Sequence, residues 1–469
     1  MTLLHTAGQR RRGWTIRTAV TLVTAALSIS AVTACSGGAG NVGSGGDGGG
    51  GGGSESKTIN VLAVNNPQML DAQKITDKYF TQKTGITVNY TMLPENEERD
   101  KATQDVANSA GQYDVTNLGP YEVPVWSKNK WLTDLSELAA KDPGYDIDDL
   151  VPSVRDAMSS DGTLYSAPFA TESTFTAYRK DWFDEQGLTM PDNPTWPQIL
   201  DLAKKLNDPS KKRAGVCVRG LAGWGQNMAL FTDMLNTFGG TWFNQDWSSG
   251  VKDPAFRETM EFYKEIAKYG PKGQASLSVS DCYNNYIAGT SAMWIDSSAA
   301  GPSIEDPKES KAAGKTGYAY MPVVKTEYSG WLWSWGWAIP QAAKNKDAAW
   351  QYISWVTGKQ YPQDMAQELG WSHYAGYMRK SVDQDPGFVA ANDAFTKITS
   401  GSLEHADPNN PGLQPRPYAG IQYLTIPEWP DLGTTAGQQL QAVLAGTKSV
   451  DQAIDTIAAA ADKVSSAHQ

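Results

Sequence analysis

Apolar and polar residues recur with two different periods along the chain, and these periods predict its helices and strands. Residues 58–64 and 86–93 are patterned as strands, whereas residues 68–84 carry apolar side chains at helical spacing and end before Gly85. The same patterns predict helices at 95–109, 195–207, 225–239, 254–269, 344–357 and 387–400, and strands at 113–118, 163–169, 214–219, 291–295, 317–323 and 331–339. This succession of strands and helices indicates an α/β protein with largely parallel sheets.

The last predicted helix is sharply marked at its start. Ser449 followed by Gln452 forms a capping box, and apolar residues then recur at helical spacing as far as Val464. The whole chain has 469 residues, which is more than one hydrophobic core usually supports. Because about 410 residues remain beyond the N-terminal region, we expect two α/β lobes with a ligand cleft between them.

The N-terminal 56 residues differ in composition from the rest and predict export. Four arginines lie between residues 10 and 17, an apolar or small stretch follows at 19–32, and Val32-Thr33-Ala34-Cys35 ends it. This order is typical of a signal peptide over residues 1–34. The final cysteine resembles a bacterial lipobox, in which the Cys35 thiol receives a diacylglyceryl group. The alternative is an ordinary secretory signal with a chance cysteine, and the export route, Sec or twin-arginine, stays open.

Residues 35–56 are interpreted as the lipidated cysteine and a glycine-rich tether, because their Gly and Ser content cannot bury a core. Two acyl chains are enough for stable anchoring. No stretch reaches the ~18 consecutive apolar residues that would span a bilayer. We therefore expect the globular part to be held at the extracellular face of the cell membrane through lipid alone.

Charge and motif content exclude several classes of function. The chain has 40 Lys and Arg against 51 Asp and Glu, a net charge of −11, and without the four leader arginines 36 basic groups remain, a net charge of −15. No basic stripe is present, so we expect no nucleic-acid partner. The sequence has no phosphate-binding loop, no GxSxG motif and no paired histidines, which predicts no cofactor, no metal and no catalytic residue. A pair of carboxylates acting on a glycosidic bond is the enzymatic alternative that remains.

Beyond Cys35 the chain has two cysteines, Cys217 and Cys282. In an oxidising exterior such a pair can form a disulfide, although a single bridge is no framework for a chain of this length. Two buried free thiols are the alternative.

Tryptophan is the residue that stands out near polar groups. Trp331, Trp333, Trp335 and Trp337 recur at every second position of WLWSWGWAI, which on a strand places them on one face. Such a face is either a core stripe or an aromatic platform, and we expect a mixture of the two.

Further candidates follow predicted strand ends, where ligand-binding groups gather in α/β sheets. They are Tyr121, Glu122, Glu172, Arg219, Trp224 and Asp296. Carboxylates accept hydrogen bonds from paired hydroxyls and arginine donates in a fork, so the set suits a polyhydroxylated ligand. Taken singly, each charged residue is also explained by a surface salt bridge.

Five segments between residues 58 and 460 carry a resemblance to a known family. They are GQYDVTNLGPYEVPVW, GVCVRGLAGWGQNMALFTDMLNTFGGTWF, AMWIDSS, GWLWSWGWAIP and QPRPYAGIQYLTIPEWPDLGTTAGQQLQAVLAG. In this order they resemble the family 1 extracellular solute-binding proteins of bacterial ABC importers, which are built like maltose-binding protein. Within that family they look like the branch that binds sugar alcohols such as mannitol and sorbitol.

The resemblance implies a type II periplasmic-binding-protein fold of two Rossmann-like lobes. The expected lobes are residues 57–170 with 330–365, and residues 171–329 with 366–469, joined by hinges near 168–174, 323–333 and 360–370. The implied function is a monomeric lipoprotein that captures a sugar alcohol and delivers it to an ABC permease. The same role for a disaccharide or oligosaccharide is the nearest alternative.

Carried over to this chain, the resemblance implies ligand-binding roles for Glu122, Glu172, Arg219, Trp224, Asp296 and Trp333, with Asn66, Tyr121, Trp335 and Tyr418 as additions. The chain departs from the branch at Leu221 and Gln226, where similar proteins tend to have Lys and Glu. This departure bears on which solute is bound.

Overall fold

The computed structural model describes residues 58–469, so the predicted signal peptide, Cys35 and the tether lie outside the described residues. The strands are β1 (Thr58–Val64), β2 (Thr87–Leu93), β3 (Val115–Leu118), β4 (Ser159–Ser160), β5 (Thr163–Leu164), β6 (Ala167–Glu172), β7 (Thr174–Arg179), β8 (Met293–Ser297), β9 (Thr316–Ala319) and β10 (Trp333–Ala338).

The α-helices are α1 (Pro67–Thr76), α2 (Gln82–Thr84), α3 (Glu95–Ala107), α4 (Glu122–Lys128), α5 (Leu135–Ala140), α6 (Pro152–Ala157), α7 (Lys180–Glu185), α8 (Trp196–Leu206), α9 (Asn227–Phe238), α10 (Pro254–Ala267), α11 (Val279–Ile287), α12 (Gly301–Glu305), α13 (Lys346–Val356), α14 (Gln360–Glu368), α15 (Lys380–Asp383), α16 (Pro386–His405), α17 (Trp429–Leu444) and α18 (Val450–His468). A π-helical segment, η1 (Asp77–Thr81), joins α1 to α2, and short 3-10 turns are η2 (Ile147–Asp149), η3 (Pro209–Lys211), η4 (Gln274–Ser276), η5 (Ser298–Ala300) and η6 (Trp371–His373).

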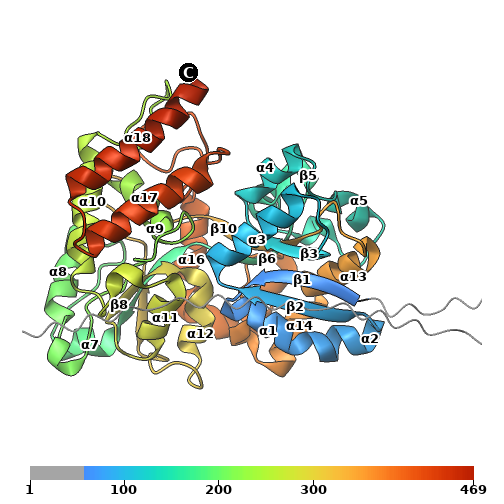
Figure 1. The fold of residues 1–469 in the computed structure, drawn as a ribbon. Coiled ribbons are helices and arrows are strands. Elements are labelled where there is room, and N and C mark those ends of the chain that lie inside the picture. Colours follow the sequence, from blue (N-terminus) through green and yellow to red (C-terminus); the bar gives the residue numbers. More distant parts are fainter. Residues whose placement is uncertain (1–57) are drawn as a thin grey trace, which may run out of the picture. The chain divides into compact units, whose positions relative to one another are not determined.

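Each helix predicted from periodicity has a counterpart at nearly the same residues (Figure 1). The capping box at the last helix is confirmed, because the Ser449 hydroxyl accepts from the Gln452 amide at 3.2 Å and the Gln452 side chain accepts from the Ser449 amide at 3.0 Å. α17 and α18 pack against each other and against α9 and α10, which buries the apolar face that the spacing indicated.

The first sheet has the strand order β2-β1-β3-β10-β6. β1 pairs in parallel with β2 and β3, whereas β10 runs antiparallel to β3 and β6. The second sheet, β8-β7-β9, is antiparallel throughout. The segment predicted as a strand at 214–219 is present only as two bridges beside β8, Ala214 to Ser291 and Cys217 to Trp294.

The expectation of largely parallel sheets is therefore wrong. Parallel pairing between named strands is confined to β1, β2 and β3. A parallel neighbour requires a crossover that returns the chain to the starting edge of its own sheet. β10 instead returns from the other sheet at the edge where β6 left the first one, because Trp333 at its start pairs with Glu172 at the end of β6. It therefore runs antiparallel to both of its neighbours, β6 and β3.

The chain crosses between the two sheets at three places. β6 ends at Glu172 and β7 begins at Thr174, so the first crossing is almost direct. Residues 320–332 lead back from β9 to β10, and in this segment Gly330 has a φ of 126° and lies against the side chains of Ser173 and Thr174. The two crossings thus run side by side.

The last crossing follows Arg379, the residue before α15. Arg379 bridges to Leu150 and binds Asp149, which keeps the residues after α14 beside elements that precede β6. α16 then packs on β7 and β9. This places the last crossing after residue 379, beyond the expected region of 360–370.

Candidate ligand-binding site

A cavity of about 570 Å³ lies among residues from both sheets and their connecting loops. The N-terminal ends of α1 and α3 face it from one side, and the loops after residue 217 and the start of α11 face it from the other. The end of β6 and the start of β10 complete it. Its polar or aromatic lining residues include Asn66, Gln68, Glu95, Asn96, Arg99, Glu172, Arg219, Trp224, Gln226, Tyr283, Trp294, Ser297, Trp331, Trp333, Trp335 and Gln422.

Arg219 reaches this cavity from an ion pair with Asp296 on β8. The Nε and Nη2 groups donate to the two Asp296 carboxylate oxygens at 2.8 and 2.5 Å, and Nη1 donates to the Gly225 carbonyl at 2.7 Å. Burial alone would lower the pKa of Arg219, but Asp296 outweighs it and raises the pKa, so the guanidinium stays charged. Three of its five N–H groups are used, which leaves two donors for a ligand.

A second buried guanidinium, Arg99 of α3, lies across the cavity. Its Nη1 group donates to Glu122, and its Nε and Nη2 groups donate to one oxygen of Glu95 at 3.2 and 3.1 Å. Glu122 also accepts from the Gly119 amide at 3.0 Å, which fixes its position at the start of α4. Burial lowers the pKa of Arg99 and its carboxylate neighbours raise it, with a net rise.

Glu172 contributes an acidic group at the end of β6. The Ser297 hydroxyl donates to its Oε2 atom, and the side chain faces the cavity. Burial raises the pKa of Glu172 to about 7, against the lowering effects of Ser297 and Arg219. The site therefore combines two guanidinium groups, which donate, with carboxyl groups that accept.

Hydrogen bonds join the two walls of the cavity. Gln226 donates to Glu95 at 3.0 Å, Asn96 donates to the Ala222 carbonyl at 3.1 Å, and Gln68 donates to the Ala299 carbonyl at 3.0 Å. A glutamate at position 226 would place two carboxylates at this distance, so the departure noted in the sequence has a structural reason. The amide of Gln226 pairs with Glu95, whereas a carboxylate would repel it.

Six of the ten predicted binding residues line the cavity: Asn66, Glu172, Arg219, Trp224, Trp333 and Trp335. The other four do not. Glu122 and Asp296 lie behind the two arginines and hold them. The Tyr121 hydroxyl donates to the Ile426 carbonyl at 3.1 Å, and the Tyr418 hydroxyl lies 2.9 Å from that of Thr241, so both tyrosines belong to buried hydrogen-bond networks.

Glu95, Arg99 and Gln226 line the cavity but are not among the ten predicted binding residues. Glu95 and Arg99 belong to the segment ENEERD, which has the composition of a solvent-exposed helix start, whereas Gln226 lies two residues after Trp224 and was noted only as a departure from the branch. Arg99 is nevertheless only 7% exposed. The run of acidic residues around Arg99 could have indicated a buried ion-pair cluster. The sequence pattern of α3 alone, however, does not show which side of the helix faces the cavity.

The four clustered tryptophans do not share one role. Trp331 precedes β10 and lines the cavity together with Trp333 and Trp335. Trp337 is fully buried and packs against Phe169 and Tyr352, with ring centroids 5.5 and 5.9 Å apart. The pairing of β10 with β6 is irregular between Trp335 and Gly336, at the point where lining residues give way to core.

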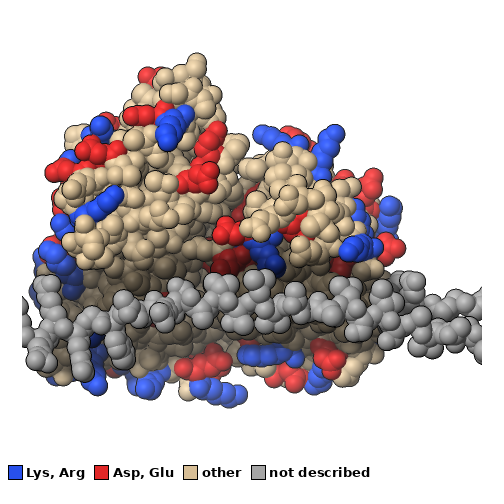
Figure 2. All heavy atoms as spheres, in the orientation of Figure 1, with Lys and Arg blue, Asp and Glu red and all other residues tan. Residues whose placement is uncertain are grey.

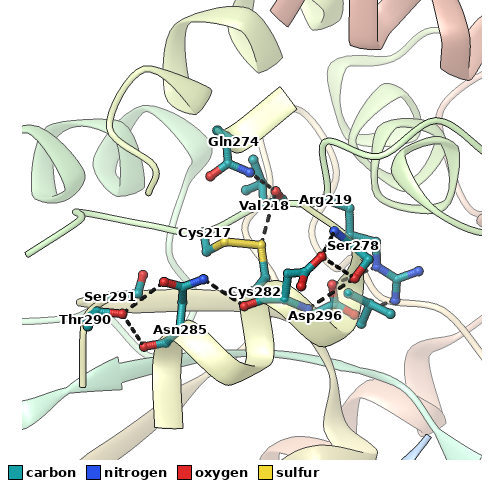
Figure 3. The surroundings of a disulfide bond; sticks show 12 residues. Cys217, Val218, Arg219, Gln274, Ser278, Cys282, Asn285, Thr290, Ser291 and Asp296 are labelled. Atoms are coloured by element: carbon teal, nitrogen blue, oxygen red, sulfur yellow. Dashed lines mark hydrogen bonds and ion pairs between the residues drawn. A yellow bond between two sulfur atoms is a disulfide. The ribbon is translucent and has the colours of Figure 1, made fainter. Parts of the chain in front are cut away.

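Cys217 and Cys282 form a disulfide in the described part of the chain (Figure 3). Cys282 lies in α11, and Cys217 lies two residues before Arg219. The Gln274 side chain donates to the carbonyl of Val218, which lies between Cys217 and Arg219 in the chain. The bridge therefore ties the segment that carries Arg219 to α11.

Between residues 58 and 469, no group of His, Cys, Asp and Glu side chains is arranged to hold a metal ion. None of the helices in that range combines the length and hydrophobicity that a membrane crossing needs. On the face shown in Figure 2, Lys and Arg side chains are interspersed with Asp and Glu and form no continuous basic stripe.

Comparison with known proteins matches the chain to a family model and to proteins of known ligand. The model for bacterial extracellular solute-binding proteins matches residues 66–361. A mannitol-binding protein of Pseudomonas aeruginosa is 38% identical over 401 residues, which cover 85% of this chain and 91% of that protein.

Two solved structures share the fold at substantial identity. An ABC transporter solute-binding protein from Agrobacterium vitis with bound D-mannitol is 40% identical, with a TM-score of 0.84 over 87% of this chain and 98% of that one. A second, from Agrobacterium radiobacter in complex with ribitol, is 26% identical, with a TM-score of 0.77 over 87% and 98% of the two chains.

Proposed function

Because the chain belongs to the family of bacterial extracellular solute-binding proteins, we propose that it is the substrate-binding subunit of an ABC importer and captures a linear sugar alcohol. The relatives that bind mannitol and ribitol support a ligand of this class. They are solute-binding proteins, so we expect the bound polyol to be released to the permease without chemical change.

The observation that carries this proposal is the pair of buried guanidinium groups facing one cavity. Arg99 and Arg219 are each held by carboxylates and each keep two N–H donors. The Glu172 carboxyl and the amides of Asn66 and Gln226 lie on the same walls. A chain of neighbouring hydroxyls can accept from the arginines and donate to the carboxyl groups, so a polyol satisfies groups that an apolar ligand would leave unpaired.

We expect the permease to recognise the closed, ligand-bound state of the two lobes. We assign the lobes to the two sheets and the hinges to the crossings at 172–174, 320–332 and after 379. Gln226 and Glu95 come from opposite walls, so their hydrogen bond exists only when the lobes are together. A polyol that contacts both walls binds the closed state better than the open one and thereby shifts the population toward it.

We place the protein at the extracellular face of the cell membrane as a monomer. The support for this is the family, whose members are extracellular, and the lipobox at Cys35 with its glycine-rich tether. Metabolic labelling with a radioactive fatty acid tests the anchor, since Cys35→Ser should abolish incorporation and release the protein into the medium.

A thermal-shift panel tests the solute. A ligand at ~100 times its Kd stabilises the folded state by about 2.7 kcal/mol. For about 410 residues the entropy of unfolding is roughly 0.9 kcal/mol/K, so the melting temperature should rise by about 3 °C. We expect this rise with mannitol, sorbitol, arabitol or xylitol and not with maltose or trehalose. A response to the disaccharides alone would contradict the proposal, as would no response to any polyol.

A further inference from the structure

The indole faces around the cavity are occupied by the protein's own guanidinium groups. The central carbon of Arg99 lies 4.1 Å from the Trp224 ring centroid, 4.8 Å from that of Trp335 and 5.1 Å from that of Trp333. Arg219 lies 5.3 Å from the Trp331 ring. Contacts of this kind stabilise a cation on an aromatic face.

The remaining surfaces of these rings are covered as well. Tyr121 packs against Trp224 with centroids 4.8 Å apart, and the edge of Tyr423 meets Trp333 at 5.7 Å. Trp224 and Trp333 are consequently only 8% and 6% exposed. The tryptophans therefore build a cage around Arg99, and little of their flat surface is free to receive a ligand.

The carboxylates keep Arg99 in this cage. Glu122 and Glu95 take three of its N–H groups, and both are themselves held, Glu122 by the Gly119 amide and Glu95 by Gln226. Moving the guanidinium off the rings would leave two carboxylates without their cation in a buried site, which is strongly unfavourable.

We propose that Arg99 is the residue that determines specificity for acyclic over cyclic carbohydrates. Binding a pyranose ring face-on needs a free indole face, and Arg99 fills that position. An acyclic polyol has no flat face to pack, and its hydroxyls can accept from the two free N–H groups of Arg99 instead. This inference rests on the proposed function, since it concerns the same cavity.

The test compares an acyclic ligand with a ring that cannot open, D-mannitol against methyl α-D-mannopyranoside, by isothermal titration calorimetry on the complete globular protein. The wild type should bind mannitol at least 100-fold more tightly than the glycoside. Arg99→Met should weaken mannitol binding at least tenfold and bring the ratio of the two affinities below tenfold, because the freed indoles admit the ring.

A second variant guards against misfolding. Arg99→Met/Glu122→Gln removes the partner charge together with the cation, so no unpaired carboxylate remains at position 122, and it should show the same narrowed ratio. The matched control is Arg213→Met, because Arg213 stacks on Trp182 at 4.2 Å and neither residue lines the cavity. Its affinities should match those of the wild type.

The outcomes separate the two ideas. If the wild type binds mannitol and the glycoside within tenfold of each other, the role of Arg99 is refuted while a polyol-binding function stands. The same holds if the variants lose affinity for both ligands in equal proportion. If the wild type binds neither mannitol nor another alditol, the proposed function itself fails.

Discussion

Asp296→Asn should destabilise the protein far more than its small change in structure suggests. Asp296 is fully buried, and both its oxygens accept from Arg219 while Oδ1 also accepts from the Ser297 amide at 2.7 Å. In the variant an amide nitrogen replaces one carboxylate oxygen, so two hydrogen-bond donors face each other at Arg219. The buried guanidinium also loses its counter-charge. Breaking a buried pair in this way costs about 3 to 5 kcal/mol.

That loss is large enough to measure by two methods. With an unfolding entropy of roughly 0.9 kcal/mol/K for about 410 residues, the melting temperature should fall by about 3 to 6 °C. Urea unfolding followed by tryptophan fluorescence gives the free energy directly. Mannitol binding should weaken at least tenfold, because Arg219 is no longer held in its orientation.

The control is an ion pair of the same length on the surface. Arg257 and Asp451 are 2.5 Å apart, with side chains 49% and 73% exposed. Asp451→Asn should cost less than about 1 kcal/mol, because water screens exposed charges and solvates each partner when the other is lost. If Asp296→Asn costs no more than Asp451→Asn, the reasoning that burial makes this pair essential is refuted.

Two further predictions concern residues away from the ligand. Replacing both Cys217 and Cys282 by alanine should lower the free energy of unfolding by about 2 to 4 kcal/mol, since the bridge closes a loop with a sequence separation of 65. The Kd for mannitol should stay within threefold of the wild-type value. An unchanged urea midpoint would contradict the predicted loss of stability. Burial raises the pKa of Asp233 to about 7, so the folded state keeps a proton that the unfolded chain loses near pH 4, and stability should fall as the pH rises from about 4 to 7. The Asp233→Asn variant has no such proton, so between pH 5 and 7.5 its free energy of unfolding should fall by roughly 2 kcal/mol less than that of the wild type, at about 1.4 kcal/mol per pH unit. Urea titrations at a series of pH values measure this difference. Parallel stability curves for the two proteins would show that Asp233 is not the group responsible.

The local pattern of apolar and polar residues predicted helices and strands well where one face of the element is exposed to solvent. α8, α10 and α18 alternate between buried and exposed residues at helical spacing, and their bounds lie within a few residues of the predicted ones. β6 is buried at every position and β7 at all but one. Strands covered on both faces show no alternation, so the sequence placed β6 too early and missed β7.

The candidate site shows the same division. Chemistry and position at or near a predicted strand end were enough to find Glu172 and Arg219, although only Glu172 ends a strand of the fold and the segment before Arg219 forms just two bridges beside β8. They were not enough to separate Arg219 from Asp296. Which of two paired side chains faces the ligand depends on their lengths and on the backbone between them, and here the longer arginine reaches past the carboxylate that holds it.

The sequence by itself determined the order of helices and strands, the clustering of tryptophan near charged groups and the family resemblance, because these depend on residues close together in the chain. The tertiary structure decided what the tryptophans are for. Arg99 lies more than a hundred residues from Trp224 and more than two hundred from Trp333 and Trp335, and no local pattern brings them together. Packing within the first lobe brings Arg99 onto Trp333 and Trp335, and Trp224 reaches it from the opposite wall of the cavity, so an apparent sugar platform becomes a cage for an arginine.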